Sequence, residues 1–263
     1  MTCLQCGVLA RIEAATFVVF LAAASSAAPQ EPVEERFSER ASSSVLLVYD
    51  GQRLEPGVER PLLAALEGAY ADLVQDLGSA PPRKIEVVVY AERDWRLATQ
   101  APDWSGGLFD GKVRVPAQGL TGVTPRLLAV LKHEMTHAFV AVRTNGRAPV
   151  WLHEGLAQVE EGKTCVPYAA ALLEGWRREK TFGLPALEGS FRRLPVAQVR
   201  SGYLVSLAAA EMLRDTRGPG AIGHLLDSLG EGTQLEQAMR ETVRADYGRV
   251  ESDLADWLES RAR

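Results

Sequence analysis

Hydrophobic positions in the first structured part of the chain predict a strand, a helix and a second strand. Residues 45–49 are a short apolar run closed by Asp50-Gly51, and residues 85–90 are a second run, rich in valine. Between the two runs, apolar residues recur at the spacing of one helix face. These residues are Leu62, Leu63, Leu66, Tyr70, Leu73, Val74 and Leu77. The pattern therefore predicts a β-α-β unit.

A hairpin is predicted next. Residues 107–109 and 113–115 are the two apolar arms, and Asp110-Gly111 between them is a strong turn signal. Pro116 is expected to end the second arm.

After this hairpin the apolar period changes from that of strands to that of helices. Thr124 is a candidate helix N-cap, with Pro125 at the first helical position. Helices are predicted over residues 125–144, 151–162, 167–179, 203–215, 219–229, 233–245 and 250–262. The chain is thus expected to be an α+β protein, with a small mixed β-sheet lobe over residues 44–123 followed by a mainly helical lobe over residues 124–263.

The amino-terminal segment is typical of a secretory signal peptide. Its apolar stretch, residues 14–28, falls short of the roughly 20 residues that a membrane-spanning helix needs. Arg11 supplies a positive flank, and Ser26-Ala27-Ala28 supplies the small residues that precede a cleavage site. We expect residues 1–28 to be removed and the mature chain to be secreted or periplasmic. The alternatives are an uncleaved segment that anchors the protein in the membrane, and a start of translation placed too early. Residues 29–43, charged and bearing Pro and Ser, are predicted to be a linker.

Composition and charge exclude several classes of protein. With 263 residues, 46% of them apolar, the chain is long enough for a full hydrophobic core, which excludes a fibrous or wholly disordered protein. The 29 basic and 34 acidic residues give a net charge of −5 without any block of basic residues, so no nucleic-acid partner is expected. Cys165 is the one cysteine in the sequence after residue 28, and we interpret it as structural rather than catalytic.

The sequence His133-Glu134-Met135-Thr136-His137 lies in the middle of the helix predicted over residues 125–144. At 100° per residue the two histidines lie about 40° apart around the helix and one turn apart along it, so both imidazoles can bind one ion. Glu134 lies about 60° from His137, beside the ion but not in line to bind it. This pattern predicts a zinc site in which Glu134 acts as general base toward a metal-activated water.

A catalytic zinc needs a third protein ligand, and a second predicted helix offers two candidates. Residues 151–157 contain His153 and Glu154. Metalloproteases whose third ligand is histidine place it six residues after the second ligand, with glycine three residues before it. Those positions are Arg143 and Val140 here, so that pattern fails. Glu154 is the favoured third ligand, and His153 is the alternative.

With these two motifs, His-Glu-x-x-His and Trp-x-x-Glu-Gly-x-Ala, the chain resembles the gluzincin metallopeptidases, in particular the small peptidase MA-like family, over roughly residues 100–260. The resemblance implies a zincin-like fold with Zn²⁺ between the two lobes. It also implies His133, His137 and Glu154 as zinc ligands, Glu134 as general base, and peptides or proteins as substrates. Sixteen residues separate His137 from Glu154, slightly fewer than in the best-known gluzincins. The Gly-Ala-Met-Glu-Asn signature of M1-type aminopeptidases is absent, so nothing implies amino-terminal trimming.

The resemblance also suggests roles for residues outside the two motifs. Tyr203 is the counterpart of an active-site tyrosine that donates to the oxyanion of the tetrahedral intermediate; the alternative is a tyrosine that packs in the core. Residues 108–109 or 113–115 correspond to an edge strand that pairs with substrate, or else form an ordinary hairpin. Trp95, Trp104 and Trp176 are interpreted as core residues rather than groove residues, and His224 as a capping or packing residue.

The favoured function is therefore a secreted or periplasmic zinc metallopeptidase. A zinc hydrolase acting on a non-peptide amide is an alternative, because the same arrangement attacks any activated carbonyl. A non-catalytic binding module with the same fold is a third hypothesis. The presence of Glu134 argues against it, because a module without activity would be free to lose the base.

Overall fold

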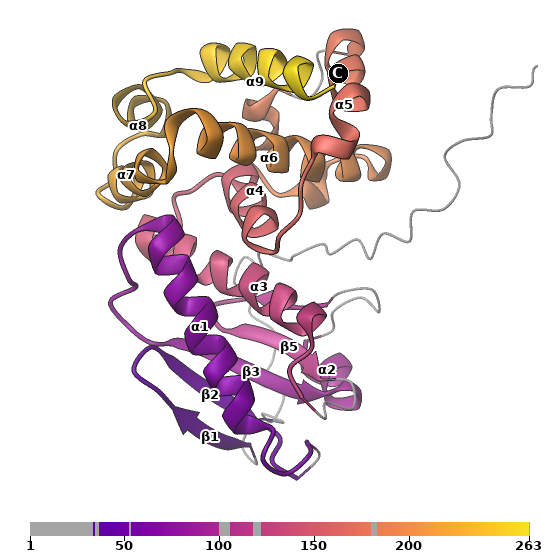
Figure 1. The fold of residues 1–263 in the computed structure, drawn as a ribbon, viewed down its shortest axis with the longest axis vertical. Coiled ribbons are helices and arrows are strands. Elements are labelled where there is room, and N and C mark those ends of the chain that lie inside the picture. The colour runs from indigo at the N-terminus through magenta and orange to yellow at the C-terminus, as the bar shows by residue number, and fades with distance from the viewer. Residues whose placement is uncertain are drawn as a thin grey trace, which may run out of the picture.

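A mixed five-stranded sheet forms the amino-terminal lobe of the protein in the computed structural model, which describes residues 34, 37–52, 54–99, 106–117, 122–179 and 183–262 (Figure 1). The strands are β1 (Ser38–Ala41), β2 (Val45–Tyr49), β3 (Ile85–Ala91), β4 (Leu108–Phe109) and β5 (Val113–Ala117). Their order across the sheet is β1-β2-β3-β5-β4. The central strands β2, β3 and β5 are parallel, and β1 and β4 are antiparallel edge strands. The predicted β-α-β unit and hairpin are both present.

The two faces of the sheet are covered differently, as the alternation of side chains along β3 shows. Val87 and Val89 point into the main core, where helices α1 (Glu59–Leu77) and α3 (Pro125–Thr144) cover the sheet (Figure 1). Val88 and Tyr90 point to the opposite face and pack with Trp95 of the short helix α2 (Glu92–Thr99). Helix α3 therefore lies on the larger core, with its far side turned toward the second lobe.

The second lobe is helical. It consists of α4 (Val150–Glu160), η2 (Val166–Tyr168), α5 (Ala169–Glu179), η3 (Leu184–Leu187), η4 (Phe191–Arg193), α6 (Val196–Arg217), α7 (Pro219–Gly230), α8 (Leu235–Thr242) and α9 (Tyr247–Arg261). Helix α4 lies between α3 and α6 (Figure 1). The contact with α6 is close because α4 carries Gly155, where a Cβ atom would lie 2.3 Å from the backbone oxygen of Ser206. This packing holds α4 against the helix that carries the two candidate histidine ligands.

Local sequence signals define both ends of α3. The Oγ1 atom of Thr124 accepts a hydrogen bond from the Leu127 amide at 3.1 Å, and Pro125 begins the helix. Asn145, with φ of 49°, adopts the left-handed conformation that ends the helix, and the Gly146 amide donates to the Ala141 oxygen. The prediction of a helix over residues 125–144 is confirmed.

Several sequence predictions differ from the structure. Residues 38–41 lie in the predicted linker but form β1, whose four side chains are all exposed, so no apolar alternation marks it. Pro116 lies inside β5, opposite Tyr90 of β3, rather than ending the arm. It is tolerated there because β4 is too short to require its missing amide hydrogen.

Two helices also differ from their predictions. Helix α2 was not predicted, because its mostly polar sequence buries little more than Asp94 and Trp95. Helix α6 begins at Val196, seven residues before the predicted start at 203. The predicted signal peptide and Trp104 lie outside the described residues. Within the described part of the chain, no helix combines the length and apolar character needed to cross a bilayer.

Candidate metal centre

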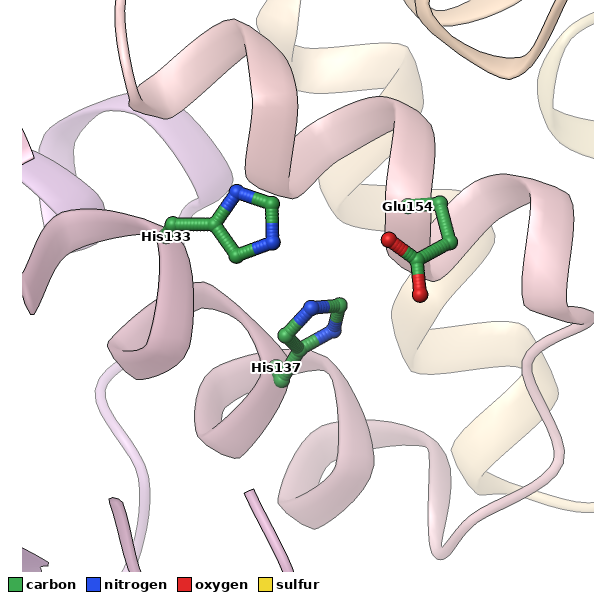
Figure 2. A group of neighbouring side chains, drawn as sticks. All are labelled: His133, His137 and Glu154. Atoms are coloured by element: carbon green, nitrogen blue, oxygen red, sulfur yellow. The ribbon is translucent and has the colours of Figure 1, made fainter. Parts of the chain in front are cut away.

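Three buried side chains from two helices converge on one point (Figure 2). His133 and His137 project from successive turns of α3, with ring centroids 5.0 Å apart. Glu154 projects toward them from α4. One potential ligand atom from each of the three residues lies within 4.8 Å of the others, and each residue is at most 2% exposed. The structure thus brings together the two histidines and the carboxylate that the sequence favoured.

The polar atoms of this group fit a divalent cation. His133 Nε2, both ring nitrogens of His137 and Glu154 Oε2 are buried and have no hydrogen-bond partner among the described residues. Buried polar atoms left unpaired cost free energy, and native proteins rarely leave several together. Two imidazole nitrogens and one carboxylate oxygen form a common ligand set of catalytic zinc. These residues therefore fit Zn²⁺.

Burial keeps the histidines in the form that binds a metal. It lowers the pKa of His133 and brings the pKa of His137 well below its ordinary value, so both imidazoles are neutral and offer a lone pair. Burial also raises the pKa of Glu154 well above the ordinary range. The charge of Lys163 offsets this only in part, and a cation at the centre would add the opposite charge that favours the ionised carboxylate.

A second carboxylate orients the first histidine. His133 Nδ1 donates to Glu161 Oε2 at 2.9 Å, and Lys163 Nζ lies 2.7 Å from the same oxygen. Burial raises the pKa of Glu161, but the hydrogen bond from His133 and the charge of Lys163 outweigh it and leave the pKa lowered. Because Nδ1 holds the proton, Nε2 presents its lone pair to the metal position. The sequence analysis missed Glu161; its signal is a carboxylate seven residues, or two helical turns, after Glu154.

Glu134 is fully buried next to the start of β4. Neither oxygen of its carboxylate has a hydrogen-bond partner among the described residues. A Cβ atom on Gly107 would lie 2.5 Å from Glu134 Oε1, so any larger residue there would displace the Glu134 side chain. Burial, and then the charge of Glu154, raise the pKa of Glu134 well above its ordinary value. Glu134 is thus a desolvated carboxylate close to the metal position, and Gly107 is a contact that the sequence did not reveal.

His153, the alternative third ligand, lies beside the centre without joining it. Its ring centroid is 5.7 Å from that of His137, and burial lowers its pKa to about 4. The described residues that can hold one ion together are His133, His137 and Glu154. His153 projects about 100° away from Glu154 around α4, because the two residues are adjacent on a helix.

Tyr203 lies at the contact between α6 and α4. Its ring is 6% exposed and packs edge-on against Phe191, with ring centroids 5.0 Å apart. Its backbone oxygen accepts a hydrogen bond from Gln158 Nε2 of α4 at 2.9 Å. This places Tyr203 one turn beyond Glu154 along α4, in a cluster of apolar side chains.

The remaining residues considered from the sequence lie away from this centre. Trp95 packs on the opposite face of the sheet, and Trp176 lies half-buried against the helical core. His224 is exposed on α7. Cys165 is fully buried, and burial raises the pKa of its thiol, as expected for a structural cysteine.

Comparisons with known proteins find similarity at the level of structure. No family model matches the chain, and no curated protein matches it. One similar solved structure is a variant of an M1 zinc metallopeptidase from Deinococcus radiodurans, with 19% sequence identity and a TM-score of 0.47 over 88% of this chain and 53% of that one. A second is the same kind of variant bound to a Tyr-Ser-Ala substrate, with 19% identity and a TM-score of 0.49 over 86% and 52%. The chain thus spans about half the length of these proteins.

Proposed function

We propose that the protein is a zinc-dependent metallopeptidase of the gluzincin type. The observation that carries the proposal is the convergence of His133, His137 and Glu154, all buried and with unpaired ligand atoms, beside the equally buried carboxylate of Glu134. A structural zinc site would use four protein ligands, whereas three leave a position open for water or substrate.

Each residue has a distinct task in this proposal. His133, His137 and Glu154 bind the metal, and Glu161 holds the His133 ring in the orientation that presents Nε2. When bound, zinc supplies a Lewis acid that polarises the scissile carbonyl and acidifies a water molecule. Glu134 accepts a proton from the attacking water and delivers it to the leaving nitrogen. Burial and the charge of Glu154 raise the pKa of Glu134, which makes its carboxylate a stronger proton acceptor.

Peptides are the proposed substrates because an extended chain can reach the site along a free strand edge. Strand β4 pairs with β5 on one side and has no strand on its other side within the described residues. Gly107, directly before β4, touches Glu134. A substrate paired with this edge by backbone hydrogen bonds would pass the general base.

Tyr203 and the cellular location complete the proposal. We propose that the Tyr203 hydroxyl donates to the oxyanion that forms during hydrolysis. Tyr203 lies where α6 packs against α4, and its backbone contacts Gln158, which is one turn after Glu154. We also propose export to the periplasm or the medium with the mature chain starting near Pro29, which amino-terminal mass spectrometry of the native protein checks. Retention of residues 1–28 in a cytoplasmic form would contradict export.

Metal analysis combined with peptide digestion tests the function. We expect one zinc per chain and cleavage of a peptide library that a chelator abolishes and added zinc restores. Glu134→Gln removes the proton acceptor but keeps the volume and the ligands, so it should retain zinc and lose at least 100-fold in turnover, since general base catalysis contributes about 10² to 10⁴. A Glu134→Gln variant as active as the wild type, or a zinc-loaded wild type that cleaves no peptide, would contradict the proposal.

A further inference from the structure

A groove runs along α3 on the side that faces β4. It has a volume of about 630 Å³ and adjoins a smaller hollow of about 130 Å³. Phe109 of β4 and Val142 of α3 line both, and Ala138 and Ala141 add small side chains on α3. Arg83, in the segment before β3, lines both the groove and the smaller hollow. Lys84 lines the smaller hollow only. The groove thus has an apolar floor and two basic side chains on one wall.

This groove lies further along β4 and α3 than the candidate metal centre, whose residues do not line it. Gly107 lies against Glu134, and Phe109 follows two residues later, about 7 Å further along the strand. On the opposite wall, Ala138 lies one helical turn after Glu134, about 6 Å along α3, and Val142 lies two turns after it. Both β4 and α3 therefore run from the general base, Glu134, toward the groove.

The distance corresponds to a few residues of an extended peptide. A strand advances about 3.3 Å per residue, so a peptide lying along β4 reaches the groove about two to four residues from the bond beside Glu134. The backbone of such a peptide would pair with the free edge of β4, while every second side chain would point toward α3. The groove is therefore placed to contact one particular substrate side chain.

The charge of the groove is positive although the chain carries a net charge of −5. Arg83 and Lys84 are exposed, and neither has an ion-pair partner among the described residues. Glu86, which also lines the smaller hollow, is paired with Lys112 at 2.7 Å. The carbonyls at the end of α3 are occupied as well, since the Gly146 amide donates to the Ala141 oxygen at 2.9 Å. Nothing described in the groove neutralises the two basic side chains.

We propose that this groove is a subsite that selects a glutamate or aspartate side chain of the substrate, two to four residues from the scissile bond. The proposal rests on the peptidase function proposed above. The methylene groups of the side chain contact Phe109 and Val142, and its carboxylate pairs with Arg83 and Lys84. The preferred substrates are thus acidic peptides.

Binding to the Glu134→Gln chain, which holds peptide without turning it over, tests the proposal. Two fluorescently labelled, carboxyl-amidated decapeptides are compared by anisotropy, one with glutamates and one with glutamines at the same positions. The acidic peptide should bind at least tenfold more tightly at low salt, with the difference shrinking as salt is added. Adding Arg83→Ala and Lys84→Ala should abolish the preference. A matched control, Arg60→Ala with Arg240→Ala, removes the same charge from exposed sites on α1 and α8 and should keep it.

Three results would overturn the subsite: equal affinity for the two peptides, no binding of either, or a preference that survives the loss of Arg83 and Lys84. A neutral decapeptide with a free carboxyl terminus is the third probe. If it binds as tightly as the acidic peptide and depends on the same two residues, the groove recognises a chain terminus and selection of a side chain is wrong. Cleavage assays separate this proposal from the function: a wild type that cleaves acidic and neutral peptides equally contradicts only the subsite, whereas one that cleaves neither contradicts the peptidase activity.

Discussion

At the scale of single residues, the site is marked by polar atoms that the protein buries and leaves unpaired. His133 has one nitrogen satisfied by Glu161, while its other nitrogen and both nitrogens of His137 have no partner among the described residues. A packed core would replace such groups with apolar ones at lower cost. A divalent cation that satisfies these atoms together would stabilise the fold, and under the proposed function the same ion would also serve catalysis.

The first prediction separates the two candidates for the third ligand. Glu154→Ala should lose bound zinc, because the Glu154 carboxylate faces His133 and His137. His153→Ala should retain close to one zinc per chain, since His153 does not belong to that ligand group. Elemental analysis of both purified variants is the measurement, with the exposed His224→Ala as control. Full zinc in Glu154→Ala together with loss in His153→Ala would make His153 the ligand.

A second prediction concerns Tyr203. If its hydroxyl stabilises the oxyanion, Tyr203→Phe should lower turnover about 10² to 10³-fold with little change in KM. Tyr247→Phe is the control, because the Tyr247 hydroxyl accepts a hydrogen bond from Trp151 Nε1 at 3.2 Å and donates one to Glu188, and Tyr247 is not part of the candidate metal group. That variant should lower the free energy of unfolding by about 0.5 to 1.5 kcal/mol and leave turnover unchanged. A Tyr203→Phe variant that melts earlier but cleaves normally would make Tyr203 a packing residue.

At the scale of elements, the position of the third ligand depends on how closely α4 packs against α6. Gly155 follows Glu154 directly, and its missing side chain lets the two helices approach until its Cα lies next to the backbone of Ser206. The Oγ atom of Ser206 donates to the Gly202 oxygen within α6, so this surface of α6 presents no unsatisfied hydroxyl. The close approach of the two helices thereby fixes the place of α4, the helix that carries Glu154.

The third prediction tests this packing. Gly155→Ala should destabilise the fold and weaken zinc binding together, because the added Cβ would lie 2.3 Å from a backbone atom and 2.9 Å from the Ala210 side chain. Gly175→Ala in α5 is the matched control, since nothing lies within 4 Å of its Cβ position. It should be neutral or stabilising by up to about 1 kcal/mol. Thermal unfolding and zinc titration of both variants are the measurements; an unchanged zinc affinity in Gly155→Ala would show that α4 can shift without moving Glu154.

At the scale of the whole molecule, one partly buried ion cluster joins the two lobes. Arg214 of α6 lies 3.3 Å from Asp76 of α1 and 3.3 Å from Glu160 at the end of α4. The charge of Lys132, from α3, lowers the pKa of Glu160. Asp76 forms a hydrogen bond with Glu160. Burial, and then the charge of Asp76, raise the pKa of Glu160 to about 7, because Arg214 and Lys132 do not fully offset them. The contact between the lobes therefore contains a carboxyl group that titrates near neutral pH.

The fourth prediction follows from this shift. Between the ordinary pKa of 4.5 and the folded value of about 7, the folded state binds more protons at Glu160 than the unfolded state does. The stabilising contribution of Glu160 to the free energy of unfolding is fully present below about pH 4.5 and is lost as the pH rises through about 7. Glu160→Gln should therefore gain stability relative to the wild type between pH 5 and pH 8, by on the order of 1 to 2 kcal/mol.

Urea unfolding of the metal-free proteins at several pH values measures this difference. Glu236→Gln, at an exposed pair with Arg240, serves as control and should show a constant offset across the same range. A stability difference between Glu160→Gln and the wild type that does not change with pH would contradict the raised pKa.

The sequence by itself determined the elements whose signals are local. Helix α3 has its predicted bounds because the apolar period, the Thr124 cap, Pro125 and the residues after Thr144 all act within a few positions along the chain. The shared face of His133 and His137 follows from helix geometry alone. The central strands were predictable for the same reason, since each is a short apolar run closed by turn residues.

Tertiary structure decided what depends on residues far apart in the chain. It brings Glu154 rather than His153 into the ligand group, a choice that the sequence left open because both lie on the same helix. It also pairs Glu161 with His133 and sets Gly107 against Glu134, two contacts that were not predicted from the sequence. Strand β1 exists only because β2 offers an edge to pair with, and its exposed side chains carry no signal of their own. Short-range geometry is fixed by covalent bonds and helix period, whereas the orientation of one helix to another depends on how all the side chains between them pack, and that cannot be read from either helix alone.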